Sequence, residues 1–254
     1  MENQLNLLLD AVDVTYGPRP EIGRYILLIA EQARALGVTF HLGRGFERLL
    51  EVNRLHADSW SPLAPTFDPR CSEITADTAL YIEGRHDGEP VVTLAIRRYD
   101  WPASTLAEEW ESGRFAYRDP ARQMQAEERW VAGAPAAASI GGRVTFGGGL
   151  WFRRDFRGRR IPLLTAGLMR CLSLTTWNPD YAIGMLETGL LSRALLPLYG
   201  HPPAQAGMLV EGGWKTLDST LIWESREDLK ARIYAAINKA EQPEAVERRI
   251  RNSR

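Results

Sequence analysis

Apolar residues recur every three to four positions in several parts of the chain, which is the spacing of an amphipathic helix. The first such stretch opens at Pro20 and closes at Gly37, a residue typical of helix ends. The spacing predicts helices at residues 20–36, 46–60, 106–110, 122–130, 162–174, 190–199 and 228–240. The chain therefore carries helices along its whole length.

Shorter apolar runs between turn residues predict strands. These runs lie at residues 38–42, 79–83, 90–97, 140–152, 181–186, 206–210 and 214–223. Asp87-Gly88 predicts a hairpin between the second and third strands, and Gly212-Gly213 predicts one between the last two. Helices and strands are thus mixed along the chain.

Residues 100–135 differ from the rest because turn signals and polar helical stretches alternate there with large aromatic residues. The aromatic residues are Trp101, Trp110, Phe115, Tyr117 and Trp130. We interpret the segment as an insertion. Its aromatic side chains either attach the insertion to the core or line an acceptor pocket.

Composition narrows the class of protein. The 254 residues are 44% hydrophobic and 25% charged, with a net charge of -1, which argues against a general nucleic-acid binder. No apolar run is long enough for a membrane-spanning helix, and the N-terminus lacks the basic start of a signal peptide. We therefore expect a cytoplasmic protein.

Cysteine and histidine usage bears on metal chemistry. Cys71, Cys171 and the four histidines show no metal-ligand spacing, so we expect no metal site. Cys171 lies inside an apolar predicted helix, where a buried free thiol is expected.

A basic loop joins the predicted strand at 140–152 to the predicted helix at 162–174. It contains Arg157, Arg159 and Arg160 around Gly158. A loop that turns into a helix presents backbone N–H groups at the positive end of the helix dipole, which suits a phosphate group. An ordinary basic surface turn is the alternative.

The loop and the elements around it resemble the GNAT acyltransferase superfamily, over roughly residues 38–224. In the family signature Arg/Gln-x-x-Gly-x-Gly/Ala, Arg157 takes the first position, while Arg160 and Pro162 replace the small residues. Downstream, GNAT proteins carry an Asn, an Ala and a Tyr. Ser192, Ala194 and Tyr199 reproduce that spacing, with Ser192 in place of Asn.

The resemblance implies a mixed α/β (α+β) fold with a twisted, mostly antiparallel central sheet flanked by helices. It divides the chain into an N-terminal helical extension (1–36), a GNAT-like domain (37–225, insertion at about 100–135) and a C-terminal helix with a charged tail (226–254). In the family the strand before the basic loop bulges and separates from the next strand, so that the pantetheine arm can pair with exposed backbone. Gly147, Gly148 and Gly149 would permit such a backbone.

The resemblance also implies acetyl-CoA or another acyl-CoA as co-substrate, and it assigns roles to particular residues. Tyr199 is the expected general acid, and Glu187 the expected base, with Glu83 as second choice. The expected cofactor-binding residues are Arg157, Gly158, Arg159, Arg160, Leu163 and Ser192, with the backbone N–H groups of Arg159, Arg160, Leu163 and Leu164 facing phosphate oxygens.

Three functions stay open at this point. The first is N-acyl transfer from an acyl-CoA to a small-molecule or protein amine, and its variant uses long-chain donors or an acyl carrier protein. The second is a non-catalytic GNAT-like binding or assembly module. The third is a tRNA contact through the arginine loop, against which the near-neutral charge argues. A homodimer is compatible with each of them.

Overall fold

A computed structural model describes residues 6–157, 160–188, 196, 200–213 and 215–241 of the chain. The strands are β1 (Asn6–Leu7), β2 (Thr39–Arg44), β3 (Ala79–His86), β4 (Glu89–Thr105), β5 (Arg129–Ala132), β6 (Gly141–Phe152), β7 (Tyr181–Glu187), β8 (Ala204–Glu211) and β9 (Leu217–Ser225). They form one nine-stranded sheet in the order β1-β2-β3-β4-β6-β7-β9-β8-β5. Neighbouring strands are antiparallel except for β6 and β7, which run parallel. The predicted mixed, mostly antiparallel sheet is confirmed.

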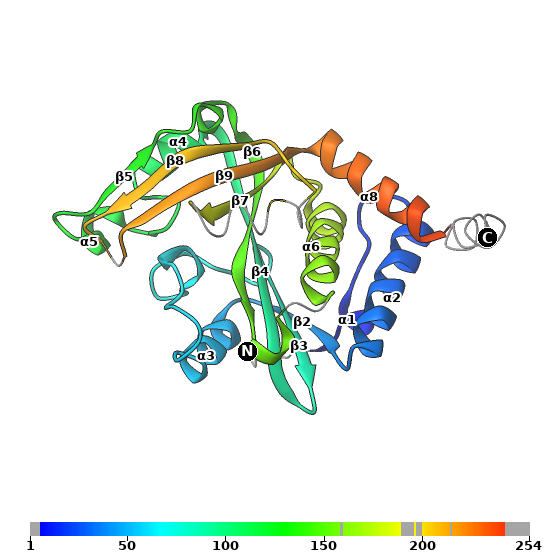
Figure 1. Ribbon diagram of the computed structural model, residues 1–254. Helices are drawn as coiled ribbons and strands as arrows, with labels where there is room; N and C mark the ends of the chain where they lie inside the picture. The colour runs from blue at the N-terminus through cyan, green and yellow to red at the C-terminus, as the bar shows by residue number, and fades with distance from the viewer. Residues whose placement is uncertain (1–5, 158–159, 189–195, 197–199, 214, 242–254) are drawn as a thin grey trace, which may run out of the picture.

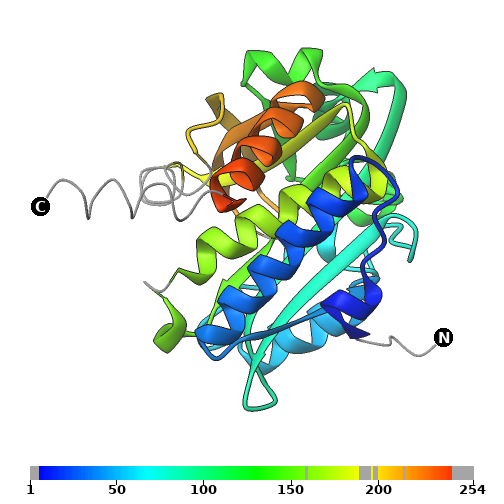
Figure 2. The ribbon, with the colours of Figure 1, turned by 90° about the vertical axis from the view of Figure 1, so that its right-hand side faces the viewer.

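Helices cover both faces of this sheet. The α-helices are α1 (Leu8–Ala11), α2 (Arg19–Ala35), α3 (Glu47–Leu55), α4 (Leu106–Glu111), α5 (Pro120–Gln123), α6 (Ile161–Trp177) and α8 (Arg226–Glu241), and the 3-10 helices are η1 (Pro65–Phe67), η2 (Pro135–Ser139) and η3 (Arg154–Phe156). Helices α2, α6 and α8 lie on one face, and α3 lies on the other (Figure 1). Helix α2 runs alongside α6 (Figure 2).

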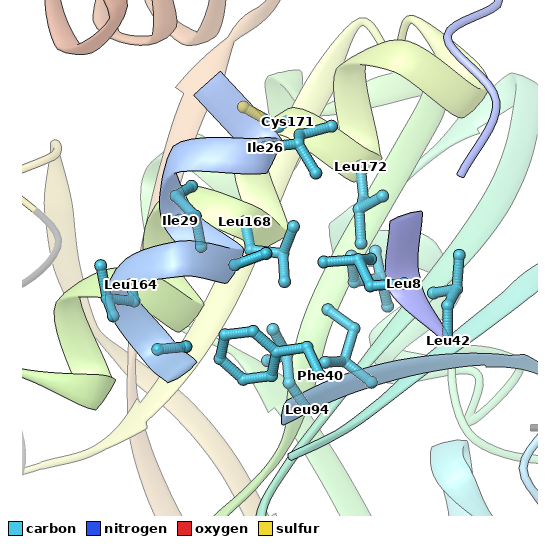
Figure 3. Packing of buried hydrophobic residues seen from close by; sticks show 14 of the residues in the cluster. Leu8, Ile26, Ile29, Phe40, Leu42, Leu94, Leu164, Leu168, Cys171 and Leu172 are labelled. Atoms are coloured by element: carbon cyan, nitrogen blue, oxygen red, sulfur yellow. The ribbon is translucent and has the colours of Figure 1, made fainter. Parts of the chain in front are cut away.

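The first hydrophobic core lies between the sheet and the helix layer of α2, α6 and α8. Ile26 and Ile29 of α2 meet Leu168 and Leu172 of α6 above the strands (Figure 3). Cys171 is fully buried in this layer, as expected, and burial raises the pKa of its thiol to about 12. Residues from the predicted N-terminal extension and from the C-terminal helix thus share one core with the central helix.

The second core lies on the opposite face and contains the insertion. Its five large aromatic side chains are all at most 8% exposed and pack against one another and against the sheet. Trp110 stands edge-on to Trp130 with ring centroids 4.7 Å apart, and its indole N–H donates to the carbonyl of Leu209 in β8. Of the two roles considered for these aromatic residues, the structure supports attachment of the insertion to the core.

The insertion also contains the clearest error of the sequence analysis. Residues 122–130 were predicted to be helical, but only α5 forms there, and residues 129–132 are strand β5. Strand β5 pairs with β8, with Trp130 opposite Val210, so the backbone finds its partners in the sheet. Tertiary pairing and the burial of Trp130 outweigh the local preference for a helix. The predicted helix at 190–199 lies outside the described residues.

Other boundaries shift by a few residues. Helix α3 ends at Leu55 rather than continuing to Trp60, and the short β1 and α1 were not predicted. The Asp87-Gly88 hairpin is present, with both residues at positive φ (50° and 83°), as the turn requires. In the described part of the chain, none of the helices has the length and apolar character needed to span a bilayer.

Removal of the Trp110 side chain should destabilise the protein strongly, because the cavity left behind lies between the insertion and β8. We expect Trp110→Ala to lower the free energy of unfolding by about 3–5 kcal/mol. Urea denaturation followed by circular dichroism measures the change. Leu55→Ala, at a side chain that is 67% exposed, is the control and should stay within about 0.5 kcal/mol of the parent. Equal effects of the two changes would contradict the assigned packing.

Candidate active site between two diverging strands

The parallel strands β6 and β7 pair over only part of their length. The paired segment runs from Val144 opposite Tyr181 to Gly147 opposite Gly184. Beyond it β6 continues along β4 to Phe152, while β7 continues along β9 to Glu187. The two strands therefore separate at Gly147 and Gly184, and each turns an edge without a strand partner toward the gap.

A β-bulge accompanies the separation. Thr93 pairs with Trp151 and Ala95 with Gly148, so that Gly149 and Leu150 together face one residue of β4. Gly149 has a φ of +58°, and its carbonyl accepts a hydrogen bond of 2.8 Å from the Thr93 hydroxyl. A Cβ atom at Gly148 would lie 2.5 Å from the Phe67 ring. Glycine is thus required at Gly149 by the positive φ and at Gly148 by the close packing.

A cavity of about 500 Å³ occupies the space that the separation opens. It is lined by the edges of β6 and β7, by α6 on the face of the first core, and by the segment 59–67 on the face of the second core. A volume of this size is typical of small-molecule sites. We call it the interstrand cavity.

On the α6 side the interstrand cavity carries an ion pair and two hydroxyl groups beside apolar side chains. Arg170 donates through Nε to Glu224 Oε2 at 2.9 Å, and both side chains are at most 10% exposed. Arg232 of α8 forms a second ion pair with Glu224. Next to this pair the hydroxyl groups of Thr145 and Ser173 are hydrogen bonded at 2.6 Å. The Glu224 carboxylate is thus held by two guanidinium groups, as a buried charge requires.

On the opposite side the interstrand cavity is aromatic. Trp151 of β6 stacks on Trp60 with ring centroids 5.7 Å apart, and His56 stacks on Trp151 at 4.4 Å. The Trp151 indole N–H donates to the Ser59 hydroxyl at 3.3 Å, which fixes the ring. Leu63, Phe67 and Met185 also line this side.

The order of elements is strand, helix, antiparallel strands, then strand, basic loop, helix and parallel strand, and this parallel pair separates. That arrangement is the one that the sequence resemblance implies. The fold is GNAT-like.

Several solved structures are similar to the chain, and acetyltransferases are among them. NAA60 of Arabidopsis thaliana in complex with acetyl-CoA is 14% identical, covering 74% of this chain and 98% of its own, with a TM-score of 0.39. RimJ of Mycobacterium smegmatis in complex with CoA-disulfide is 15% identical, covering 78% and 89%, with a TM-score of 0.37. An uncharacterised protein of Bacillus halodurans is 10% identical, covering 80% and 93%, with a TM-score of 0.42. No protein-family model and no curated protein sequence matches the chain.

Of the predicted cofactor-binding residues, Arg157 lines the interstrand cavity. Its Nε donates to the carbonyl of Phe152 at 3.1 Å, which places the guanidinium group at the open end of β6. Arg160 is exposed and is the N-cap residue of α6. Gly158, Arg159 and Ser192 lie outside the described residues, as does the predicted general acid Tyr199.

Two of the four backbone N–H groups predicted to meet phosphate, those of Leu163 and Leu164, already have a partner within the helix. Leu163 and Leu164 both donate to the carbonyl of Arg160, at 3.1 and 3.3 Å. Pro162 has no N–H to offer. A phosphate at this helix end would therefore compete with the Arg160 carbonyl for the Leu163 and Leu164 donors, and the arginine side chains are the better candidates for an anion.

The two glutamates considered as base lie in different surroundings, and neither lines the interstrand cavity. Glu187, at the end of β7, is exposed and 3.3 Å from the Lys215 ammonium group. Glu83 is fully buried and accepts hydrogen bonds from Tyr81, Arg48 and Arg85 at 2.6, 3.1 and 2.6 Å. Burial alone would raise the pKa of Glu83, but these donors outweigh it and hold the pKa below its ordinary value.

Several cavity residues were missed by the sequence analysis, although two signals were available. Arg170 is the only charged residue in the apolar helix α6, and a lone charge there needs a buried partner. The segment after α3 combines Trp60 with Pro62 and Pro65, which is unusual for a solvated loop. Neither signal identifies the partner, because Glu224 is 54 residues from Arg170.

The lowered pKa of Glu83 predicts a pH dependence of stability. Because the folded-state pKa lies below the unfolded value, the carboxylate stabilises the fold above pH 4.5 or so, and this contribution is lost as the pH falls through the folded-state pKa. At pH 7 we expect Glu83→Gln to cost about 1–3 kcal/mol of unfolding free energy. The difference from the parent should shrink as the pH is lowered.

Denaturant titrations between pH 3 and pH 7 measure this difference. Glu187→Gln is the matched control, because the exposed pair with Lys215 contributes only about 0–1 kcal/mol. A Glu83→Gln variant as stable as the parent at pH 7 would show that the three donors do not stabilise the fold through this carboxylate.

Proposed function

We propose that the protein is an acyl-CoA-dependent N-acyltransferase that takes its donor into the interstrand cavity. The observation that carries the proposal is the separation of β6 and β7 beyond Gly147 and Gly184, with a cavity of about 500 Å³ at that point. Separated strand edges offer backbone N–H and C=O groups that an extended ligand can pair with, as an added strand would. The pantetheine arm of CoA has two amide groups suited to such pairing.

The basic loop supplies charge at the mouth of the cavity. Arg157 lines the cavity, and Arg160 lies three residues further on at the start of α6. Guanidinium groups pair well with phosphate oxygens because their donors lie in one plane. The diphosphate of CoA would be held at the open end of β6, with the thioester deeper between the strands.

The reaction follows from this placement. The lone pair of a neutral amine attacks the thioester carbonyl carbon, a C–N bond forms, the C–S bond breaks, and the thiolate takes up a proton as the amine loses one. Among the described residues that line the cavity, Glu224 is the only carboxylate, and it is already engaged in ion pairs with Arg170 and Arg232. We assign proton donation to Tyr199. Glu187 would act on the amine through water at the end of β7.

A second candidate is a non-catalytic module that has kept the GNAT-like fold. It is favoured by the Leu163 and Leu164 N–H groups, which are used inside the helix, and by Pro162, which has none. The two candidates differ in one measurable property, because only the enzyme must bind an acyl-CoA and release free CoA.

Arg157→Ala should weaken binding of acetyl-CoA and CoA about 10- to 100-fold, which is the usual loss for a hydrogen bond to a charged group. Isothermal titration calorimetry gives the dissociation constants, and release of free thiol reports turnover with an added amine. Arg154→Ala is the matched control in the same loop, since Arg154 is exposed and does not line the cavity. It should stay within about threefold of the parent.

The outcomes separate the two candidates. Binding that Arg157→Ala weakens, together with thiol release that needs an amine, supports the enzyme. If no CoA compound binds the parent protein, the acyltransferase proposal is wrong and the non-catalytic module stands. Arg157→Ala also removes the hydrogen bond to the Phe152 carbonyl, so circular dichroism of each variant checks that it is still folded.

A further inference from the structure

The side of the interstrand cavity that faces the second core has an unusual composition. Trp60, Leu63, Phe67, Trp151 and Met185 line it, and we call these five residues the aromatic wall. Trp60 and Trp151 are stacked, and Phe67 stacks on Phe146 beneath the wall with ring centroids 5.2 Å apart. Phe67 and Trp151 are at most 4% exposed, so the wall is anchored in the core.

Charge is segregated away from the aromatic wall. Three charged side chains line the cavity in the described part of the chain, namely Arg157, Arg170 and Glu224. Arg157 belongs to the basic loop, and the other two form an ion pair with each other on the α6 side. The aromatic wall thus offers no carboxylate that could bind a cation or the hydroxyl groups of a sugar. An apolar chain bound against the wall would be removed from water, which is favourable.

The aromatic wall continues from the strands that form the proposed donor site. Trp151 follows Gly148 on β6 by three residues, and Met185 directly follows Gly184, the last residue of β7 that pairs with β6. Met185 and Trp60, on which Trp151 stacks, pack in the second core, whereas Phe156 and Ile161 on either side of the basic loop pack in the first core. A donor with its diphosphate at the basic loop and its thioester between the strands would therefore direct its acyl group toward the wall.

We propose that the aromatic wall is a binding site for the acyl tail of the donor, and that the preferred donors carry acyl chains longer than acetyl. This proposal rests on the proposed acyltransferase function and adds the class of donor to it. The segment 59–67 would cover the apolar tail, because it lines the cavity while the insertion aromatics are buried in the second core.

The test is a titration series with acetyl-, butyryl-, hexanoyl-, octanoyl- and decanoyl-CoA, with free CoA as reference. Each methylene that enters the aromatic wall should tighten binding about threefold to fourfold. Hexanoyl-CoA should thus bind about 100-fold more tightly than acetyl-CoA, and the gain should level off once the chain outgrows the wall. The measurement needs no acceptor, so an apolar acceptor cannot imitate the result.

A variant locates the effect. Ala64 lines the cavity beside Leu63, and Ala64→Phe should fill the space and bring the octanoyl-to-acetyl affinity ratio to within about threefold of one. Ala76→Phe adds the same bulk to an exposed position that does not line the cavity, and it should keep the ratio of the parent. A melting temperature within about 4 °C of the parent confirms that each variant is folded.

Each result has one meaning. A chain-length gain that Ala64→Phe abolishes and Ala76→Phe preserves supports the tail site. Equal affinity for acetyl-CoA and octanoyl-CoA overturns it while leaving the acyltransferase proposal intact. A chain-length gain that survives Ala64→Phe also overturns the tail site. Failure of every CoA compound to bind overturns the acyltransferase proposal itself, and the tail site with it.

Discussion

Strand β6 stays paired with β4 but not with β7 along its whole length, and the candidate site depends on this difference. Its pairing with β4 continues to Phe152, while β7 pairs with β9 to Glu187, and the two strands remain together only from Val144 to Gly147 on β6. The bulge at Gly149 turns β6 without breaking its ladder to β4. The gap is therefore maintained by strong pairing on its outer sides, and it needs no ligand to hold it open.

The buried ion pair of the gap lies on one side of it only. Arg170 and Arg232 surround Glu224 on the α6 side, and Glu83 occupies a separate cluster with Arg48 and Arg85 on β3. Both carboxylates are buried and both have two guanidinium partners. For Glu83, the hydrogen bonds from Tyr81, Arg48 and Arg85 outweigh burial and hold the pKa below its ordinary value.

The sequence was most informative where local pattern and tertiary structure agree. Helices α2, α6 and α8 and the Asp87-Gly88 hairpin were predicted because periodicity and turn chemistry act within a few residues. Strand β5 was missed because its partner β8 is about 80 residues away, and no local signal describes that pairing.

The candidate site divides in the same way. The basic loop was identified from the sequence, and the structure shows that Arg157 of this loop lines the cavity. The ion pair of Arg170 and Glu224 and the aromatic wall could not be deduced, because each joins elements that only the folded sheet brings together. At the start of α6, by contrast, the sequence suggested a feature that the structure changes. The first N–H groups of a helix usually lack a partner within it, but here Leu163 donates to the Arg160 carbonyl, which also accepts the regular helix bond from Leu164, and Pro162 has no N–H.

The position of β5 has a consequence for the order in which the chain is made. Strand β5 comes from the middle of the sequence, soon after β4. It pairs with β8 at the edge of the sheet, several strands away from β4. During synthesis the insertion with Trp110 and Trp130 emerges well before Leu209 and Val210, the residues that will receive it. Until then its aromatic surface has no partner in β8, so the nascent chain exposes apolar surface and an unpaired strand, the features that make folding intermediates prone to aggregation.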